Sequence, residues 1–500
     1  MTGPTRPHRG ARDLIAAVLD EHTYRSWDEE IPVPAAAVDS PGYRADLARA
    51  RERSGEDEAV LTGEGELAGR PIAMVVSEFR FLAGSIGVVT AARILAAVER
   101  ATRQGLPLLA VTASGGTRMQ EGALAFARMP GIAAAVAAHK AAGLPYVVYQ
   151  RHPTTGGVLA SWGSLGHLTL AEPGALIAFL GPKVYEALHG EAFPAGVQTA
   201  ENLLAHGVVD AVVAPEALRE HLATFLDLVR YDGAGTAEGA ASPEPAPDAG
   251  PGPAWESVER TRRAQRPGLA EVLAHHGEPL VALSGTGRGE TADGLVVGVT
   301  RFAGTACVLI GQDRAAGRTA PIGPGSLRTV RRALVIAREL DLPVVTVIDT
   351  VGATLSVAAE QGALAGEIAS CLADLATVGV PTLAVLLGQG TGGAALALLP
   401  TDRVVAARHA WLTPLPPEGA SVIVHGTVDR AAEVAGTQHI RSTDLLAARI
   451  VDAIIDERPD AADEPAAFCR RVVATIDREL QTARGLSPED RLRRRSRAGT

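Results

Sequence analysis

The chain has 500 residues, of which 47% are hydrophobic and 21% charged, so it can bury large cores and exceeds the length of one ordinary domain. Its formal net charge of −10 argues against a general affinity for nucleic acids or anionic membranes, although a local basic cluster could still contact phosphates. The three cysteines lie far apart and form no C-x-x-C pair, which excludes a local zinc ribbon and is typical of reduced thiols. We therefore expect a cytoplasmic protein with two domains and no bound metal.

The first half of the chain contains a predicted strand, helix and strand in succession. The apolar run 108–113 (LLAVTA) predicts a short buried strand, residues 118–143 predict helix, and 145–150 (PYVVYQ) predict the next strand. A Gly pair follows, and residues 158–166 (VLASWGSLG) open another helix. Alternating strands and helices predict a parallel sheet with right-handed crossovers, and such sheets bind ligands at the carboxyl ends of their strands. Residues 1–60 show no motif that carries chemistry.

A linker separates this half from the next. Residues 232–254 consist mainly of Gly, Ala, Pro, Ser and acidic residues, and none of them is large enough to anchor a core. We therefore divide the chain into a domain at 1–231, the linker at 232–254 and a second domain at 255–488. The polar, basic stretch 489–500 predicts a frayed tail.

The second half repeats the order of the first. Runs at 344–349 (VVTVID) and 382–387 (TLAVLL) predict strands, and helix is expected over 358–379 and again at 395–400 (ALALLP). Residues 378–400 are uncharged over a length that could span a bilayer, but they contain two Pro, five Gly and a Gln. A buried strand, a Gly-rich turn and a buried helix explain this composition better than a membrane span.

The two halves match in a constant register. The same 236 positions separate four pairs of residues, namely Leu106 and Leu342, Gly116 and Gly352, Pro145 and Pro381, and Gly157 and Gly393. Coincidence could produce one such match, but hardly four in one frame with strand-like apolar runs between them. The sequence therefore predicts a duplicated domain.

Each half places a Gly pair at the start of a predicted helix, as TTGG at 154–157 and as GTGG at 390–393. Such a pair leaves backbone N–H groups uncovered at a helix N-terminus, where the macrodipole also favours negative charge. The pattern predicts an oxyanion hole or a phosphate cradle in each half. The alternative is that the glycines only permit tight packing of strand against helix. Two equivalent holes indicate chemistry in which two carbonyl oxygens become negative.

Longer motifs extend this correspondence to a known family. Residues 112–125 (TASGGTRMQEGALA) and 143–188 closely resemble the carboxyltransferase β subunit of bacterial acetyl-CoA carboxylase. Residues 341–353 (DLPVVTVIDTVGA), 379–397 and 412–424 resemble the α subunit of the same enzyme. The similarity also includes the segment AWESVERTRRAQRP, which is similar to the helix that opens that α subunit.

The resemblance covers roughly residues 60–455. It implies two tandem crotonase-like domains of the ββα-superhelix type shared with ClpP, and a fusion of β-like and α-like subunits. It further implies transfer of a carboxyl group from carboxybiotin on a carrier protein to the α-carbon of a short acyl-CoA, such as acetyl-CoA or propionyl-CoA. The products would be of the malonyl-CoA type, as in fatty acid biosynthesis. The implied partners are the acyl-CoA, a biotin carboxyl carrier protein, a biotin carboxylase and a second copy of the chain in a homodimer.

The resemblance also implies site residues by motif position. One hole would be formed by Gly156 and Gly157, with the acyl-CoA as the favoured ligand, and the other by Gly392 and Gly393. These holes would stabilise the thioester enolate and the ureido oxygen of biotin. No side chain need act as a general base, because the ureido group freed of CO2 can take the α-proton. Further residues expected to bind substrate are Ser114, Gly115, Gly116, Arg118, Thr155, Gly352 and Thr391.

Other polar residues near these motifs have weaker assignments. Arg118 is placed to contact a CoA phosphate or carboxylate, with an ordinary surface arginine as the alternative. A loop-rich stretch corresponds to a basic segment of the α-like subunit, or is simply a solvated loop, and contains Arg314, Arg318 and Arg328. Residues expected to have only structural roles are His152 and His167, as turn or packing residues, Glu121, as a helix-face charge, and Glu172, as a strand-end cap.

Two features depart from the family pattern. The four-cysteine zinc ribbon of many β subunits is absent, so neither a metal nor a nucleic-acid role is expected. The turn DTVGATLS at 349–356 lacks two prolines and an aromatic residue of the family motif, which is compatible with a changed acyl group, a specialised pathway or reduced activity. The alternatives that remain are an acyl-CoA decarboxylase, a biotin-independent crotonase-type enzyme acting on acyl-CoA, and a catalytically silent paralogue.

Overall fold

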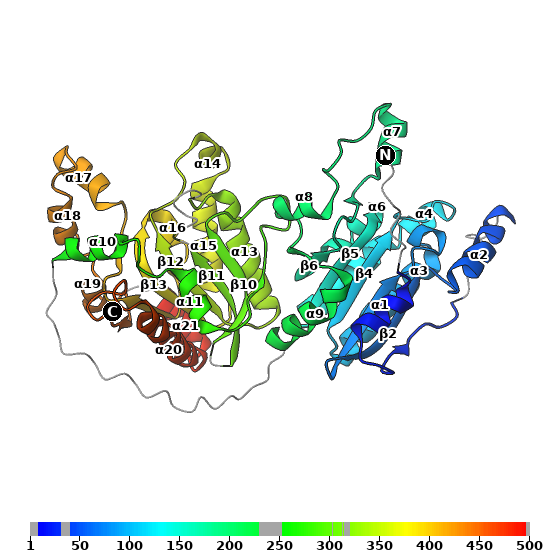
Figure 1. Ribbon diagram of the computed structural model, residues 1–500, viewed down its shortest axis with the longest axis horizontal. Helices are drawn as coiled ribbons and strands as arrows, with labels where there is room; N and C mark the ends of the chain where they lie inside the picture. Colours follow the sequence, from blue (N-terminus) through cyan, green and yellow to red (C-terminus); the bar gives the residue numbers. More distant parts are fainter. Residues whose placement is uncertain are drawn as a thin grey trace. The chain divides into compact units, whose positions relative to one another are not determined.

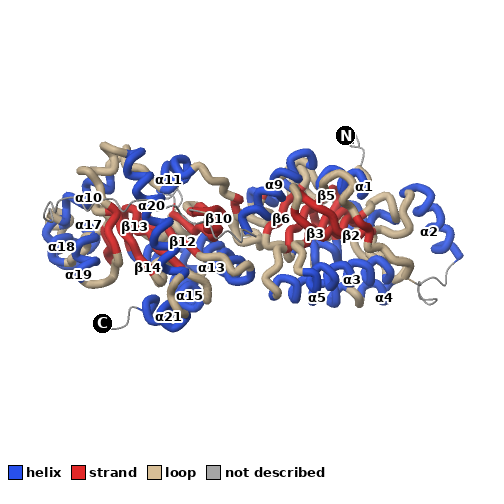
Figure 2. Tube along the Cα trace, turned by 90° about the horizontal axis from the view of Figure 1, so that it is seen from below, coloured by secondary structure: helices blue, strands red, loops and turns tan. Residues whose placement is uncertain are grey.

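The chain folds into two compact units, Met1–Leu226 and Asp227–Thr500 (Figure 1). The computed structural model describes residues 9–31, 41–229, 253–302, 304–312, 314 and 321–496. Each unit has its own sheet with helices on both faces (Figure 2), which confirms the expected tandem α/β domains. Most of the predicted linker at 232–254 lies outside the described residues.

The sheet of the first unit has the strand order β1-β2-β3-β4-β5-β6-β8, and β7 pairs with β5. The strands are β1 (Arg25–Ser26), β2 (Val60–Leu67), β3 (Arg70–Ser77), β4 (Leu108–Ser114), β5 (Tyr146–Thr155), β6 (Leu168–Ala171), β7 (Ile177–Ala178) and β8 (Ala211–Val212). The helices are α1 (Ala11–Val18), α2 (Pro41–Ser54), α3 (Val88–Gln104), α4 (Gly122–Phe126), α5 (Met129–Ala141), α6 (Gly156–Leu159), α7 (Pro182–His189), α8 (Ala200–Ala205) and α9 (Pro215–Val229), with short 3-10 turns at Leu82–Gly84 and Trp162–Ser164.

The sheet of the second unit has the equivalent order, β16-β14-β13-β12-β11-β10-β9, and β15 pairs with β13. The strands are β9 (Val281–Ala282), β10 (Leu295–Phe302), β11 (Thr305–Gln312), β12 (Val344–Thr350), β13 (Thr382–Thr391), β14 (Arg403–Ala407), β15 (Trp411–Thr413) and β16 (Ala453–Ile455). The helices are α10 (Ala254–Arg262), α11 (Leu269–His276), α13 (Pro324–Glu339), α14 (Val357–Gln361), α15 (Leu364–Thr377), α16 (Gly392–Leu396), α17 (Pro417–His425), α18 (Ala431–Thr437), α19 (Ser442–Ala447), α20 (Pro465–Arg484) and α21 (Pro488–Ser496).

Both sheets contain the predicted parallel strands and also antiparallel strands that the sequence analysis did not predict. Strands β3 to β6 and β11 to β14 run parallel, but β2 pairs antiparallel with β3 and β10 antiparallel with β11. In both hairpins a glycine with positive φ lies in the short turn, Gly69 at +74° and Gly304 at +76°. Because no helix separates the strands of a hairpin, the alternation of strands and helices did not reveal them.

The duplication is visible in the backbone. The β4–β5 ladder shifts register just before Ser114, and the β12–β13 ladder shifts just before Thr350, 236 positions later. Parallel bridges recur at the same spacing, at Ile86–Thr117 and at Ile322–Ala353. The duplicated domain predicted from four matched pairs of residues is confirmed.

The central strands are buried along their whole length. All seven residues of β4 and of β12 are buried, because helices cover both faces of a parallel sheet. Residues 378–400 form the buried strand, turn and helix that their composition predicts, as β13 followed by α16. In the described part of the chain, no helix is long and apolar enough to cross a membrane.

The C-terminal segment forms a docked helix, which corrects the prediction of a frayed tail for residues 489–496. In α21, the guanidinium of Arg495 is buried and donates to both carboxylate oxygens of Asp402, at 2.6 and 3.2 Å. It also donates to the carbonyl of Val380 at 2.5 Å. In the sequence, a run of arginines predicts a solvated segment. In the structure, Arg495 faces inward and pairs with the buried carboxylate of Asp402.

Candidate functional site

A tight turn follows β4 at the carboxyl end of the first sheet. The Ser114 hydroxyl accepts a hydrogen bond from the Gly116 N–H at 3.0 Å, and Gly116 has φ +106°, which favours glycine. The Gly115 N–H donates to the carbonyl of Ala83 at 2.9 Å. Three residues predicted to bind substrate, Ser114, Gly115 and Gly116, therefore form one turn.

The Thr-Gly-Gly turn after β5 lies directly against that first turn. Gly156 has φ +64°, and a Cβ added there would lie 3.2 Å from the Cα of Gly116. The Gly156 N–H donates to the carbonyl of Phe179 at 3.0 Å. Gly157 lies in the first turn of α6, where an N–H has no partner within the helix. The Gly157 amide is therefore the better placed of the two as a donor to a ligand.

The second unit repeats this arrangement. Gly352 has φ +126° and Gly392 has φ +63°, and the Gly352 N–H donates to the Thr350 hydroxyl at 3.2 Å. The altered turn at 349–356 thus keeps the geometry of its counterpart without the family's prolines and aromatic residue. Its last residue, Ser356, caps α14 by accepting a hydrogen bond at 3.1 Å.

The threonines before the two Gly pairs differ in their partners. The Thr155 hydroxyl donates to the carbonyl of Ser114 at 3.2 Å, which ties the first site together. Thr391 is only 2% exposed, and its hydroxyl has no hydrogen-bond partner among the described residues. An unpaired buried hydroxyl costs free energy, so this group is a candidate for contact with a bound molecule.

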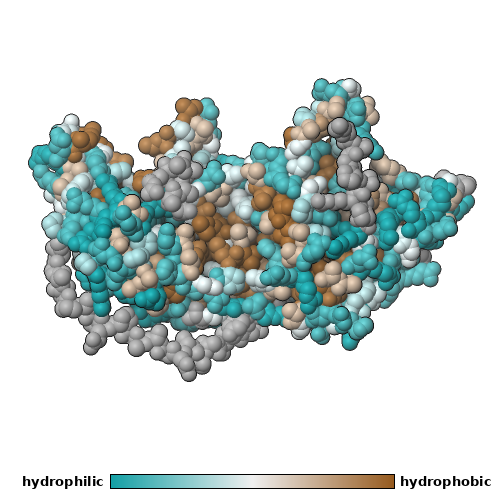
Figure 3. Space-filling view, in the orientation of Figure 1, coloured by the Kyte–Doolittle hydropathy of each residue, from teal (hydrophilic) through white to brown (hydrophobic). Residues whose placement is uncertain are grey.

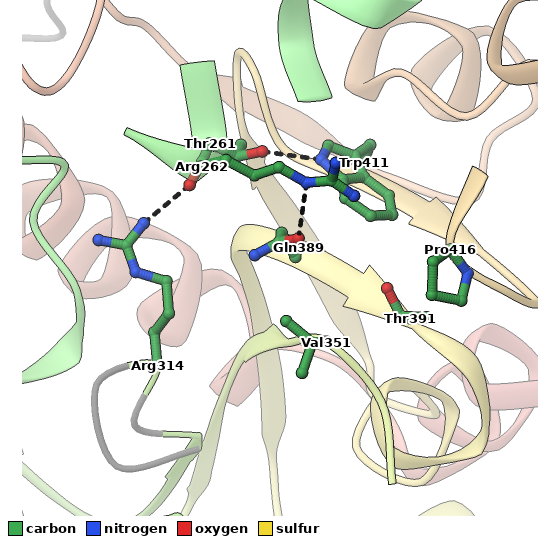
Figure 4. Close-up of a pocket in the computed structure, with 8 residues that line it drawn as sticks. All are labelled: Thr261, Arg262, Arg314, Val351, Gln389, Thr391, Trp411 and Pro416. Atoms are coloured by element: carbon green, nitrogen blue, oxygen red, sulfur yellow. Dashed lines mark hydrogen bonds between the residues drawn. The ribbon is translucent and has the colours of Figure 1, made fainter. Parts of the chain in front are cut away.

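A pocket of ≈ 290 Å³ opens beside Thr391 in the second unit (Figure 4). The side chain of Arg262 extends over Gln389, with 3.5 Å between Nε and Oε1, and Trp411 Nε1 donates to the Thr261 hydroxyl at 2.8 Å. Apolar surfaces and a few fixed polar groups are the usual lining of a small-molecule site. The lining residues are Thr261, Arg262, Arg314, Val351, Gln389, Thr391, Trp411 and Pro416.

Sequence reasoning missed six of these lining residues, namely Thr261, Arg262, Val351, Gln389, Trp411 and Pro416. Arg262 lies in the AWESVERTRRAQRP segment and Gln389 immediately precedes the GTGG motif, so both had a motif nearby that could have indicated them. Trp411 immediately precedes the family motif at 412–424, which could likewise have indicated it. It reaches the pocket because β15 pairs with β13 beside Gln389.

Arg118 is not placed to meet a substrate phosphate. Its side chain is 1% exposed and pairs with Glu58 and Glu121. Burial lowers the pKa of the guanidinium, but Glu58 and Tyr43 raise it more, so this pKa lies above its ordinary value. Its backbone follows the predicted site turn, but its charge is neutralised inside the protein.

The predicted loop arginines have different surroundings. Arg314 lines the pocket and donates to the carbonyl of Thr261 at 2.8 Å. Arg328 pairs with Glu290 and Glu367 at the surface of α13, as expected of the solvated alternative. Arg318 lies outside the described residues.

The residues expected to be structural have structural partners. His167 Nδ1 accepts from the Tyr146 N–H at 3.0 Å, and His152 Nδ1 accepts from the Leu176 N–H at 3.0 Å. Burial lowers the pKa of His152, so the neutral form that can accept this hydrogen bond is favoured. Glu172 follows β6 and accepts from the His152 N–H at 3.2 Å. Glu121 belongs to the buried cluster around Arg118 rather than to an exposed helix face.

Comparison with known proteins decides the family. The model of the carboxyl transferase domain matches residues 40–495. The chain belongs to this family. It is 54% identical over 480 residues to the probable biotin-dependent acyl-coenzyme A carboxylase beta3 subunit of Mycobacterium tuberculosis, covering 96% of this chain and 95% of that one. It is 36% identical to the acetyl-coenzyme A carboxylase carboxyl transferase subunits beta/alpha of Saccharopolyspora erythraea, covering 93% and 84%.

Solved structures support the same fold for this carboxyltransferase. Transcarboxylase 12S, solved with methylmalonyl-coenzyme A and methylmalonic acid bound, superposes with a TM-score of 0.73 at 20% identity, covering 96% of this chain and 91% of that one. The resemblance drawn from the sequence and the two tandem crotonase-type domains are thereby confirmed, as is the assignment to the carboxyltransferases. Within the described ranges, no group of three or more His, Cys, Asp or Glu side chains is arranged to hold a metal ion.

Proposed function

We propose that this carboxyltransferase moves a carboxyl group from carboxybiotin, held on a separate carrier protein, to the α-carbon of a short acyl-CoA. The observation that carries the proposal is the pair of equivalent Gly-Gly turns, with Gly156 and Gly392 at almost the same φ. Each turn begins a helix at the carboxyl end of a parallel strand. Two relatives support the same reaction, since the name of one includes biotin and acyl-coenzyme A and the name of the other includes acetyl-coenzyme A and carboxyl transferase.

Two oxyanions form in such a transfer, and each turn would stabilise one of them. Backbone donors that are fixed before the reaction stabilise an oxyanion more strongly than water does, because they need not reorganise as the negative charge develops. We assign the Gly156–Gly157 hole to the thioester oxygen of the acyl-CoA. We assign the Gly392–Gly393 hole to the ureido oxygen of biotin.

The pocket beside Thr391 supports this assignment of the second hole. A small ring with a polar edge fits a pocket of ≈ 290 Å³ that offers Gln389, Arg314 and the unpaired Thr391 hydroxyl. Val351 and Trp411 supply apolar surface for the ring. In the first unit, Thr155 is already paired, so its hydroxyl is less available to a ligand than that of Thr391.

The turns contain no residue suited to act as a general base. Residues 114–118, 154–160 and 389–397 include no Asp, Glu or His, and the only such residue in the turn at 349–356 is Asp349. Its carboxylate is buried and already accepts a hydrogen bond from the Gln389 N–H at 3.0 Å. A biotin-independent hydratase or isomerase of the crotonase type needs a positioned acid and base, so this alternative is disfavoured. We propose that the biotin ureido group itself accepts the α-proton, and that these turns only bind and orient the two substrates.

The residues after the first Gly pair favour short acyl groups. Ala160, Ser161, Gly163 and Ser164 are all small, and we propose acetyl-CoA or propionyl-CoA as the acceptor. With a carboxylated carrier supplied, acetyl-CoA and propionyl-CoA should be carboxylated much faster than a long-chain acyl-CoA, as followed by mass spectrometry of the products. Preference for the long-chain substrate would contradict this part of the proposal.

The active unit is proposed to be a symmetric homodimer in which the first unit of one copy faces the second unit of the other. Exposed apolar residues occur at equivalent positions of the two units, 236 residues apart, as Met119 with Leu355, Phe179 with Leu415, and Leu188 with Val424. In Figure 3, hydrophobic residues gather over α14 and α17, which carry or adjoin the second member of each pair. Exposed apolar clusters of this kind mark interaction surfaces.

Light scattering of the purified chain should therefore give at least twice the monomer mass, and Leu355→Glu or Phe179→Glu should shift it toward the monomer while abolishing activity. Cleavage within 232–254 should leave both the assembly and its activity intact, because the composition of that segment predicts a linker. An active monomer of the unmodified chain would contradict the arrangement.

A further inference from the structure

A buried cluster of charged side chains lies beside the first Gly turn. Arg118 donates to Glu58 at 2.5 Å through one nitrogen and to Glu121 at 3.1 Å through the other. The Tyr43 hydroxyl donates to Glu121 at 2.5 Å and accepts from Arg118 at 3.2 Å. All four side chains are buried. A buried ion pair is stable only when its polar atoms have hydrogen-bond partners, because the free-energy penalty of removing the charges from water is otherwise not offset.

The cluster is bonded to the backbone segment that holds the turn. The Glu121 carboxylate accepts from the Val88 N–H at 2.5 Å, at the start of α3. Arg118 donates through its side chain to the Ser85 carbonyl at 2.9 Å and through its backbone to Ile86 at 2.9 Å. The Ile86 N–H in turn donates to the carbonyl of Gly116 at 2.9 Å. Residues 85–88 therefore connect the charged cluster to the turn at 114–118.

The turn at 114–118 determines the position of the proposed thioester hole at Gly156–Gly157. The Cα of Gly116 lies 3.2 Å from the place where a Cβ of Gly156 would be, and a Cβ of Gly116 would lie 3.6 Å from the Gly157 nitrogen. The backbones of Gly116 and Gly156 therefore lie against each other with no Cβ between them. A shift of residues 114–118 would consequently move or uncover the donor at Gly157.

The second unit lacks this cluster, although its backbone is equivalent. The positions 236 residues after Glu58, Arg118 and Glu121 are Gly294, Thr354 and Val357. Thr354 donates through its hydroxyl to the carbonyl of Pro321 at 2.8 Å, and Val357 is 73% exposed. The fold therefore forms the equivalent turn without a counterpart of the Arg118 cluster, so the turn does not need this cluster to form.

We propose that Arg118, with Glu58, Glu121 and Tyr43, is a positioning residue for the first oxyanion hole, and that the group ties helix α2 to that hole. Tyr43 comes from α2, Glu58 precedes β2, and Arg118 and Glu121 follow β4. The group holds the 114–118 turn at the distance that leaves the Gly157 amide aimed at the ligand. The link to catalysis rests on the function proposed above, whereas the link to the position of the turn does not.

The test uses Tyr43→Phe, which removes one hydroxyl, and Arg118→Met, which removes the central charge. Tyr149→Phe is the matched control, because the Tyr149 hydroxyl is also buried and donates to the carbonyl of Val213 at 2.9 Å without touching the turn. Hydrogen exchange followed by mass spectrometry should show faster exchange in peptides covering 114–118 and 156–158 for both test variants. The equivalent peptides of the second unit, 350–354 and 392–394, should be unchanged.

Kinetics of carboxyl transfer give the second readout. Arg118→Met should lower kcat by up to about 10²-fold, the loss expected for a donor misplaced by about 1 Å, and Tyr43→Phe should lower it less, with the KM values of both substrates nearly unchanged. The proposal is overturned if Tyr43→Phe has the same hydrogen-exchange rates and the same kcat as Tyr149→Phe. It is also overturned if Arg118→Met speeds hydrogen exchange uniformly through the first unit. If the unmodified chain transfers no carboxyl group, the proposed function fails, and the exchange pattern still decides the positioning role.

Discussion

Replacing Gly157 with valine should lower kcat for carboxyl transfer by about 10²–10³-fold, the loss typical of one oxyanion-hole donor. A Cβ at this position would lie 3.0 Å from the Thr117 hydroxyl and 3.7 Å from the Met129 Cε, so the larger side chain displaces the amide or blocks its approach. Gly393→Val should have a loss of the same order, because its Cβ would meet Ile368 Cδ1 at 2.6 Å. Steady-state kinetics with both substrates varied measures each loss.

Gly131→Val serves as the matched control for the first substitution. Gly131 lies exposed in α5, and nothing stands within 4 Å of its added Cβ. This variant should keep full turnover, with at most a small change in stability, because valine has a higher helix propensity than glycine. Full activity in Gly157→Val and Gly393→Val would show that the two turns only pack strand against helix.

Arg495→Met should lower the free energy of unfolding by about 3–5 kcal/mol, the usual cost of removing one partner of a buried ion pair. The substitution leaves the Asp402 carboxylate buried with the Thr382 N–H as its remaining backbone donor, at 2.8 Å. It also removes the hydrogen bond that joins α21 to Val380. Urea denaturation measures the loss, as the change in the free energy of the second unit's unfolding transition.

The control for this stability prediction is Arg493→Met on the same helix. Arg493 is 73% exposed in its side chain and pairs with Asp490 of the same helix. Such surface pairs contribute about 0–1 kcal/mol, so the control should change stability little. Equal losses in the two variants would mean that α21 is not held by the buried pair.

Much of the fold followed from the sequence because its signals are local. The four matched pairs lie in strands and turns whose residue types depend on neighbours close in sequence, and Gly116 and Gly352 are needed for their positive φ. The predicted strands at 108–113, 145–150, 344–349 and 382–387 all lie within observed strands or one residue outside. The two Gly pairs, Gly156–Gly157 and Gly392–Gly393, likewise fall where a strand ends and a helix starts.

The parts that sequence reasoning missed depend on contacts between distant segments. Whether Arg118 meets a substrate or a carboxylate is decided by Glu58, 60 residues away in the chain. Arg495 donates to Asp402, 93 residues away in the chain, and Trp411 donates to Thr261, 150 residues away. A lone arginine or tryptophan carries no local signal that distinguishes such partners from solvent.

The most direct measurement follows a labelled carboxyl group. Malonyl-CoA and methylmalonyl-CoA, each labelled with ¹³C in the free carboxyl group, are incubated with the purified chain and a biotinylated carrier, without ATP or bicarbonate. The account predicts that the label appears on the carrier in proportion to the acetyl-CoA or propionyl-CoA released, and that both processes stop when the carrier is omitted. If neither substrate is consumed with a competent carrier present, while an enoyl-CoA or simple acyl-CoA is converted without biotin, the account is contradicted.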